Sequence, residues 1–164
     1  MKQIIRLDIN GETQEVAVEP HHTLLQVLRD ELGLIGTKKG CDTGGCGCCT
    51  ILLDGKAVYS CMVYAMTARD KKITTVEGLS DSATLDPIQQ AFIDAGAVQC
   101  GYCTCGMIMA AKGYLSSNGS HLPGDLEIRQ AIAGNLCRCT GYQKIVDAIR
   151  LAASRRLVET SAKG

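Results

Sequence analysis

The chain has 164 residues, 46% hydrophobic and 21% charged, a globular composition that excludes an extended disordered protein. Seventeen basic residues balance seventeen acidic ones, so charge favours neither nucleic acid nor an anionic membrane as a partner. Residues 1–8 alternate polar and apolar side chains, unlike a signal peptide, and no apolar run reaches membrane-spanning length. We therefore expect a cytoplasmic protein, and in the cytoplasm clustered cysteines indicate a metal rather than disulfides.

The first half of the sequence predicts a β-rich domain over residues 1–78. Its alternating apolar pattern predicts five strands, over residues 4–10, 13–18, 50–53, 57–60 and 73–76. A helix is expected between the first two strands and the rest, with Thr23 as its N-cap and Gly33 at its end. A loop dense in glycine and cysteine follows it over residues 36–49.

After residue 78 the hydrophobic period becomes helical. A small polar linker is predicted over residues 79–84, and a four-helix domain over 85–164. Asp86 and Asp125 are the expected caps of the first and third helices. The four helices are predicted over residues 87–95, 105–116, 126–133 and from about 142 onward. The two halves together predict an α+β fold.

Ten cysteines form two groups, one in each predicted domain. In the first group Cys41, Cys46 and Cys49 have the spacing C-x4-C-x2-C, and Cys61 is a distant fourth. This is the ligand spacing of a plant-type [2Fe–2S] ferredoxin. Glycines such as Gly44 surround these cysteines and let the backbone approach a cluster closely. The first group therefore predicts a [2Fe–2S] site.

The second group consists of two pairs, Cys100-x2-Cys103 and Cys137-x-Cys139. Each pair lies near the predicted start of a helix, where free N–H groups and the helix dipole favour thiolates. Four ligands from two separated segments would also hold the helical domain together. The second group therefore predicts a second metal site.

Other metal centres use similar residues. Structural zinc is the strongest alternative for the second group considered alone, because four cysteines also make a zinc site. A Rieske centre needs two histidines, but His21, His22 and His121 are far in sequence from every cysteine pair. The C-x-x-C-H motif of a c-type haem and the βαβ context of a thioredoxin-like motif are missing. Iron–sulfur clusters are the metal centres that best account for both cysteine groups together.

Two cysteines are left over. Cys48 adjoins Cys49, so spacing alone also permits C-x-C, and we assign Cys49 as the ligand because its x2 spacing matches the plant-type pattern. Cys105 follows Cys103 by two residues. We expect Cys48 and Cys105 to be small buried thiols.

Three motifs carry a family resemblance: G-C-D-x-G-x-C-G-x-C-T from Gly40, Q-C-G-Y-C-T from Gln99 and C-R-C-T-G-Y from Cys137. The sequence resembles the iron–sulfur subunit of molybdenum hydroxylases, the xanthine oxidase family, in its bacterial form with separate subunits. The resemblance covers nearly the whole chain with the motifs in the same order. Family members usually have alanine at the position of Cys48 and proline at that of Cys105.

The resemblance implies a ferredoxin-like β-grasp domain followed by a helical domain, with two [2Fe–2S] clusters. It implies a large partner subunit that carries a molybdopterin cofactor, and a flavin subunit that carries FAD. Electrons then pass from molybdenum through the helical-domain cluster and the ferredoxin-type cluster to flavin. Gln99 matches the family position that hydrogen-bonds the pterin, and Cys139 lies on the same side. The chain would be part of an oxidoreductase but not catalytic by itself, and the substrate would bind another subunit.

The residues by themselves leave a second class of function open. The chain could be a freestanding two-cluster carrier or a metal-stapled binding module. A freestanding carrier needs neither the helical domain nor a pterin-facing Gln99, and one-cluster ferredoxins are typically acidic, whereas this chain is neutral.

Overall fold

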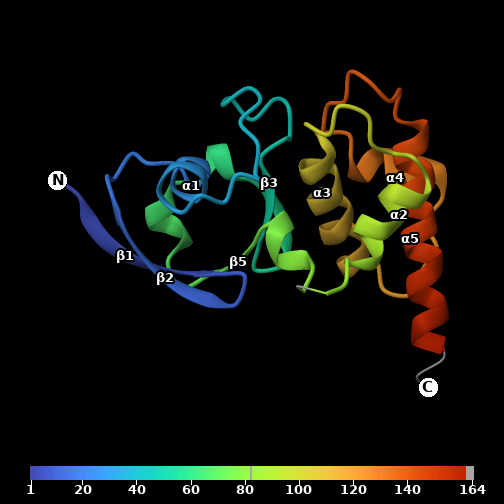
Figure 1. Ribbon diagram of the computed structural model, residues 1–164, viewed down its shortest axis with the longest axis horizontal. Coiled ribbons are helices and arrows are strands. Elements are labelled where there is room, and N and C mark those ends of the chain that lie inside the picture. Colours follow the sequence, from blue (N-terminus) through green and yellow to red (C-terminus); the bar gives the residue numbers. More distant parts are fainter. Residues whose placement is uncertain (82, 162–164) are drawn as a thin grey trace.

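The computed structural model describes residues 1–81 and 83–161, and a sheet-containing half is followed in it by a helical half. Figure 1 shows the blue-to-green N-terminal half on the left and the yellow-to-red helices on the right. The predicted α+β fold class is confirmed. The boundaries at 78 and 84 stay predictions, and residue 82 of the expected linker lies outside the described residues.

Five strands form one mixed sheet. They are β1 (Gln3–Ile9), β2 (Glu12–Val18), β3 (Thr50–Leu53), β4 (Lys56–Tyr59) and β5 (Lys72–Thr74). Their order across the sheet is β2-β1-β5-β3-β4, with β1 parallel to β5 and every other neighbouring pair antiparallel. Each strand lies close to its predicted position, although β5 begins one residue earlier and ends two residues earlier than expected. The parallel pairing of β1 with β5 requires a crossover connection, and a helical segment lies within it.

That helical segment has Thr23 as its N-cap, as predicted, but it does not continue as a regular α-helix to Gly33. The Thr23 hydroxyl accepts a hydrogen bond from the Gln26 amide, and Gln26 Oε1 accepts one from the Thr23 amide. After α1 (Leu24–Gln26) the chain continues over Val27–Glu31 with wider π-type turns, since the Leu32 amide bonds the Val27 carbonyl five residues back. This wider turn leaves Val27 and Leu28 both fully buried against the sheet.

The helical half contains the four predicted helices. They are α2 (Pro87–Asp94), α3 (Thr104–Ser117), α4 (Asp125–Ala131) and α5 (Gln143–Ser161). The prediction that Asp125 caps the third helix is wrong by one residue, because α4 already includes it. The Glu127 carboxylate accepts the Gly124 amide at 2.8 Å and so satisfies a free N–H at this end. The helices enclose a core of their own that includes Phe92, Met107 and Ile149.

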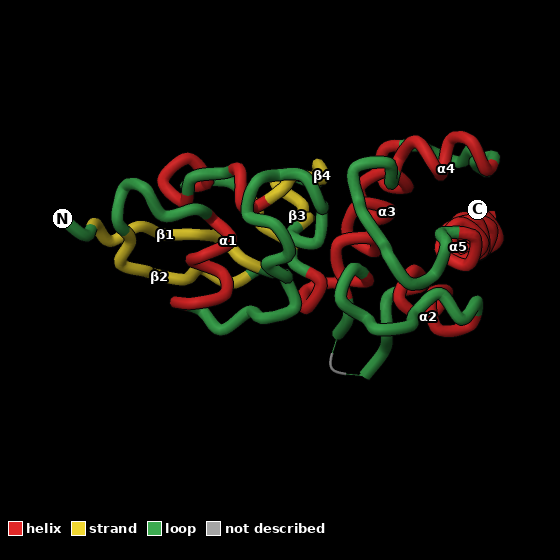
Figure 2. The backbone as a smooth tube through the Cα atoms, turned by 90° about the horizontal axis from the view of Figure 1, so that it is seen from above, coloured by secondary structure: helices red, strands yellow, loops and turns green. Residues whose placement is uncertain are grey.

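Helix α3 joins the two halves. It packs against β3 and β4, and Figures 1 and 2 both show it between the sheet and the other helices. Gly113 makes this approach possible, since a Cβ there would lie 3.1 Å from Leu52 and 3.2 Å from Ala57 on the β3–β4 hairpin. The loops at one end of α3 are therefore held close to the loop that precedes β3.

Across residues 1–81 and 83–161, the helices are each too short or too polar to cross a membrane.

Candidate metal centres

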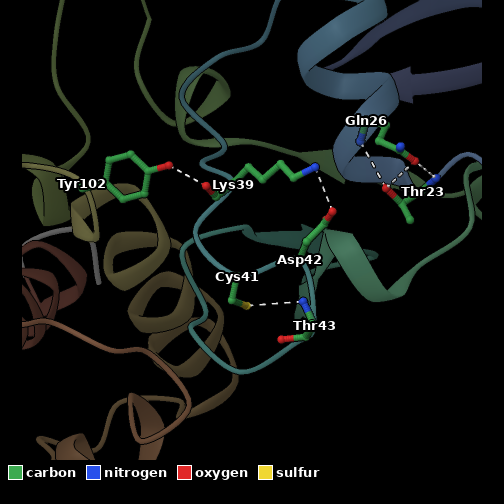
Figure 3. Close-up of polar contacts among 7 residues, drawn as sticks. All are labelled: Thr23, Gln26, Lys39, Cys41, Asp42, Thr43 and Tyr102. Carbon is green, nitrogen blue, oxygen red and sulfur yellow. Dashed lines mark hydrogen bonds and ion pairs between the residues drawn. The ribbon is translucent and has the colours of Figure 1, made fainter.

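The loop over residues 36–49 carries the first cysteine group and has neither helix nor strand. Polar contacts hold it instead, as Figure 3 shows. Lys39 Nζ lies 2.8 Å from an Asp42 carboxylate oxygen, and the Thr43 amide donates to Cys41 Sγ at 3.4 Å. From the helical half, the Tyr102 hydroxyl donates to the Lys39 carbonyl at 2.6 Å. The loop conformation thus depends on both halves of the chain.

The four thiols of the first group lie close together as two pairs. Cys41 interacts with Cys46, and Cys61 interacts with Cys49. Cys61 also interacts electrostatically with Cys41, so the two pairs lie close to each other. Cys49 and Cys61 are buried, whereas Cys41 and Cys46 are partly exposed. The structure therefore brings together all four residues that the spacing selects.

The second group also forms two pairs, and here they come from distant segments. Cys100 Sγ lies 3.6 Å from Cys139 Sγ, and Cys103, just before α3, interacts with Cys137. The Tyr142 hydroxyl accepts the Cys137 amide at 2.9 Å and holds that segment in place. Each segment therefore contributes one thiol to each pair.

Local hydrogen bonds and burial set the thiol pKa values in opposite directions. The Thr43 amide and the neighbouring Cys46 lower the pKa of Cys41 to about 6, which favours its thiolate at neutral pH. Burial raises the pKa of Cys61 to about 11 and that of Cys103 to about 12. Burial acts the same way on Cys137, but hydrogen bonds from Thr140 outweigh it and lower the pKa of that thiol.

The donor set fits a two-iron cluster at each position. All ten cysteines lie within the described residues and are free thiols. Within residues 1–81 and 83–161, no three Cys, His, Asp or Glu side chains are disposed around a single ion, and the thiols gather in pairs instead. In a [2Fe–2S] cluster each of the two irons takes two thiolates, so two adjacent pairs match its needs.

The two remaining thiols lie between the groups. Cys48 and Cys105 are buried, at 7% and 9% exposure, and Cys105 Sγ lies 3.7 Å from the Cys48 carbonyl oxygen. Cys48 also interacts with Cys46 and Cys103, one cysteine from each group. The predicted burial of both side chains is confirmed. Burial raises the pKa of Cys48 to about 12, so it stays protonated at neutral pH.

The candidate pterin contact is on the surface. Gln99 is exposed, and so are Cys100 beside it and Cys139 opposite Cys100. The sequence excludes a Rieske centre because its histidines are far from every cysteine pair, and in the structure His121 pairs with Glu127 at 3.1 Å. The second cysteine group is therefore exposed at the position where the resemblance predicts a partner subunit.

Comparisons with known proteins agree with this geometry. A model described as "2Fe-2S iron-sulfur cluster binding domain" matches residues 7–80, and one described as "[2Fe-2S] binding domain" matches residues 75–150. The chain is 46% identical to the nicotinate dehydrogenase small FeS subunit of Eubacterium barkeri, over 94% of this chain and 97% of that one. The chain belongs to the iron–sulfur small subunits of the molybdenum hydroxylases.

Solved structures of this family share the fold. A chain of quinoline 2-oxidoreductase from Pseudomonas putida 86 is 44% identical with a TM-score of 0.88, covering 94% of this chain and 97% of that chain. The aldehyde oxidoreductase from Desulfovibrio desulfuricans ATCC 27774 is 39% identical with a TM-score of 0.90, and the match covers 96% of this chain but 17% of that longer one. This iron–sulfur subunit therefore has two [2Fe–2S]-binding domains, and its relatives are parts of larger oxidoreductases.

Sequence reasoning missed residues that connect the two metal centres of this iron–sulfur subunit. Asn135 Nδ2 donates to the Gly47 carbonyl at 2.8 Å, and the Leu136 amide donates to the Cys46 carbonyl at 2.9 Å. The Tyr59 hydroxyl donates to the Gly134 carbonyl at 3.1 Å. None of these contacts has a signal in the sequence, because each joins residues 75 or more positions apart.

Proposed function

We propose that Cys41, Cys46, Cys49 and Cys61 hold one [2Fe–2S] cluster and that Cys100, Cys103, Cys137 and Cys139 hold the other. The observation that carries this proposal is the arrangement of each group as two adjacent thiol pairs, including the 3.6 Å approach of Cys100 Sγ to Cys139 Sγ. When bound, such clusters accept and release one electron at a time.

The neighbouring thiols favour Cys49 over Cys48 as the ligand in the first centre. Cys49 packs with Cys61 and Leu25 in one buried cluster, and Cys61 is the distant fourth ligand. Cys48 interacts with Cys46 of the first centre and also with Cys105 of the helical half, and the Cys105 thiol lies 3.7 Å from the Cys48 carbonyl oxygen. Cys49 thus completes a pair within the first centre, whereas Cys48 lies between the two centres.

The partner of this subunit is a larger molybdopterin-binding subunit, and electrons leave through a flavin subunit that binds FAD. Exposure of Gln99, Cys100 and Cys139 supports this, because a pterin on a partner can reach the second centre only where that centre is open to the surface. The first centre is then the farther one and passes electrons to flavin. A cytoplasmic location and the assignment of Gln99 as a pterin contact are parts of the same proposal.

Iron and acid-labile sulfide assays on the purified subunit test the cluster assignment. We expect four iron and four sulfide per chain, because each [2Fe–2S] cluster contains two of each. EPR of the dithionite-reduced protein should show two distinct signals. Stoichiometric zinc, or a single iron–sulfur signal, would contradict the proposal.

Purification from the native host tests the partners. A molybdopterin subunit and a flavin subunit should copurify with this chain, and the chain separated from them should oxidise no substrate. Substrate oxidation by the isolated chain would show that it is catalytic by itself.

A further inference from the structure

Asn135 is a buried polar residue that reaches from one metal centre to the other. Its side chain is 4% exposed, and it lies between α4 and Cys137. Its Nδ2 donates to the Gly47 carbonyl at 2.8 Å and to Thr50 Oγ1 at 3.2 Å, both in the N-terminal half. A buried amide needs such partners, since burial without them costs free energy.

The Gly47 peptide is held on two sides. Gly47 has φ +71°, and a Cβ on it would lie 2.7 Å from Asn135 Nδ2 and 2.5 Å from the Gly134 carbonyl. On the other side, a Cβ on Gly106 of α3 would collide with the Gly47 carbonyl. Gly47 therefore fits between Asn135 and α3 only as glycine.

The position of this peptide matters because its neighbours are the cysteines of the first centre. Gly47 follows Cys46 directly and precedes Cys49 by two residues, while Asn135 precedes Cys137 by two. The parallel bond from the Leu136 amide to the Cys46 carbonyl, at 2.9 Å, completes a hydrogen-bonded unit that contains cysteines of both centres.

We propose that Asn135 is a positioning residue that fixes the two metal centres relative to each other, an inference that rests on the proposed function. Its amide holds the Cys46–Cys49 segment and its backbone leads directly into Cys137. Two reduced clusters are paramagnets whose mutual interaction depends steeply on their separation and orientation. Movement of one loop against the other therefore changes that interaction without removing a ligand.

The test is low-temperature EPR of the fully reduced holoprotein carrying Asn135→Leu, which keeps the volume of the side chain but removes both hydrogen bonds. We expect iron content to stay at the wild-type level while the inter-cluster line splitting and relaxation enhancement are lost or clearly reduced. Gln89→Met is the matched control, because it removes an inter-half hydrogen bond, from Gln89 Nε2 to the Val76 carbonyl at 3.3 Å, that involves neither cysteine group. That variant should keep the wild-type interaction.

Several outcomes overturn the inference. It fails if the Asn135→Leu interaction equals that of the wild type while only the melting temperature falls, or if Gln89→Met changes the interaction equally. A wild-type protein whose two signals do not interact also overturns it, whereas a wild type without two [2Fe–2S] signals contradicts the proposed function itself.

A second variant covers the case in which leucine is not tolerated. Asn135→Ser is smaller and too short to reach the Gly47 carbonyl, and it should show the same loss of interaction. If both variants lose both clusters yet stay folded by circular dichroism, Asn135 serves cluster assembly rather than the relative position of the centres, and the inference fails. Unfolding of both variants would assign Asn135 to general stability instead.

Discussion

The proposed ligand Cys49 and the adjacent Cys48 lie one residue apart in different surroundings. Cys48 and Cys49 are both buried, at 7% and 2% exposure, so burial does not distinguish them. Their neighbours differ, since Cys49 packs with Cys61, whereas Cys48 interacts with Cys46 and also with Cys105 of the helical half. A ligand contributes the free energy of metal-coupled folding, and a spare thiol contributes only packing.

Alanine substitutions at these positions should therefore separate the two roles. We expect Cys49→Ala to lose the EPR signal and two irons of the first centre, whereas Cys48→Ala and Cys105→Ala keep four irons. Iron assays and EPR of the three purified variants make the comparison. If Cys48→Ala lost the signal and Cys49→Ala kept it, the ligand assignment would be reversed.

A second residue-scale prediction concerns Asp54, in the turn between β3 and β4. Its carboxylate accepts the Lys72 amide at 2.9 Å and lies 3.3 Å from Lys71 Nζ, and these contacts lower its pKa. Because the folded-state pKa is below the unfolded value, the stabilisation is present above the unfolded-state pKa and is lost as pH falls through the folded-state pKa.

Asp54→Asn removes the charge but keeps an acceptor oxygen and a residue type that tolerates the positive φ of 49°. The variant should be less stable than the wild type at neutral pH, and the difference should disappear in acid. Urea unfolding of both proteins at the same pH values measures the difference between their free energies of unfolding. Effects of acid that act equally on both proteins do not contribute to that difference. A difference that does not change with pH would refute the electrostatic explanation.

At the scale of elements, α2 depends on its first residues. Asp86 precedes Pro87, its side chain accepts the Ile88 amide at 3.0 Å, and the Gln89 side chain accepts the Asp86 amide at 2.9 Å. The other Asp86 oxygen lies 2.5 Å from Lys112 Nζ on α3. One carboxylate therefore both begins α2 and ties it to the helix that contacts the sheet.

Asp86→Ala should lower the free energy of unfolding by about 1–2 kcal/mol, the usual cost of losing an N-cap. Lys112→Met is the matched control, since it removes the ion pair and leaves the cap, and should cost about 0–1 kcal/mol. Urea unfolding of the cluster-loaded protein provides both values. Equal losses in the two variants would show that the ion pair, not the cap, dominates.

At the scale of the whole molecule, the hydrophobic cores and the metal centres are separate. The sheet core includes Leu7 and Ile51, and the helical core includes Phe92 and Ile149. In contrast, residues 36–49 have no regular hydrogen bonding and carry three of the four proposed first-centre ligands. The metal should therefore stabilise the loops more than the cores.

Removing iron with a chelator under reducing conditions should leave the sheet and helices folded and release the loops. We expect hydrogen exchange to accelerate strongly over residues 36–49 and 134–141, with little change in β1 or α5. Mass spectrometry of exchange in the loaded and iron-free proteins measures this pattern. A uniform loss of protection across β1 and α5 would show that the clusters hold the whole fold.

The separation of the hydrophobic cores from the metal centres also explains which features of the structure could be predicted from the sequence. The five strands and four helices follow from local hydrophobic period and capping residues, and both cysteine groups follow from ligand spacing, because these signals act over a few neighbouring residues. The local signals were insufficient at Val27–Glu31, where a wider turn replaces the expected helix, and at Asp125, where Glu127 satisfies the helix end.

The sequence by itself determined which residue types the centres contain, since short spacings such as C-x4-C-x2-C keep three thiols within one short loop. Only the tertiary structure decided how distant segments meet. Cys100 pairs with Cys139, and Asn135 bonds the Gly47 carbonyl. These contacts depend on α3 packing against the β3–β4 hairpin, and such packing is a property of the assembled cores rather than of any local sequence pattern.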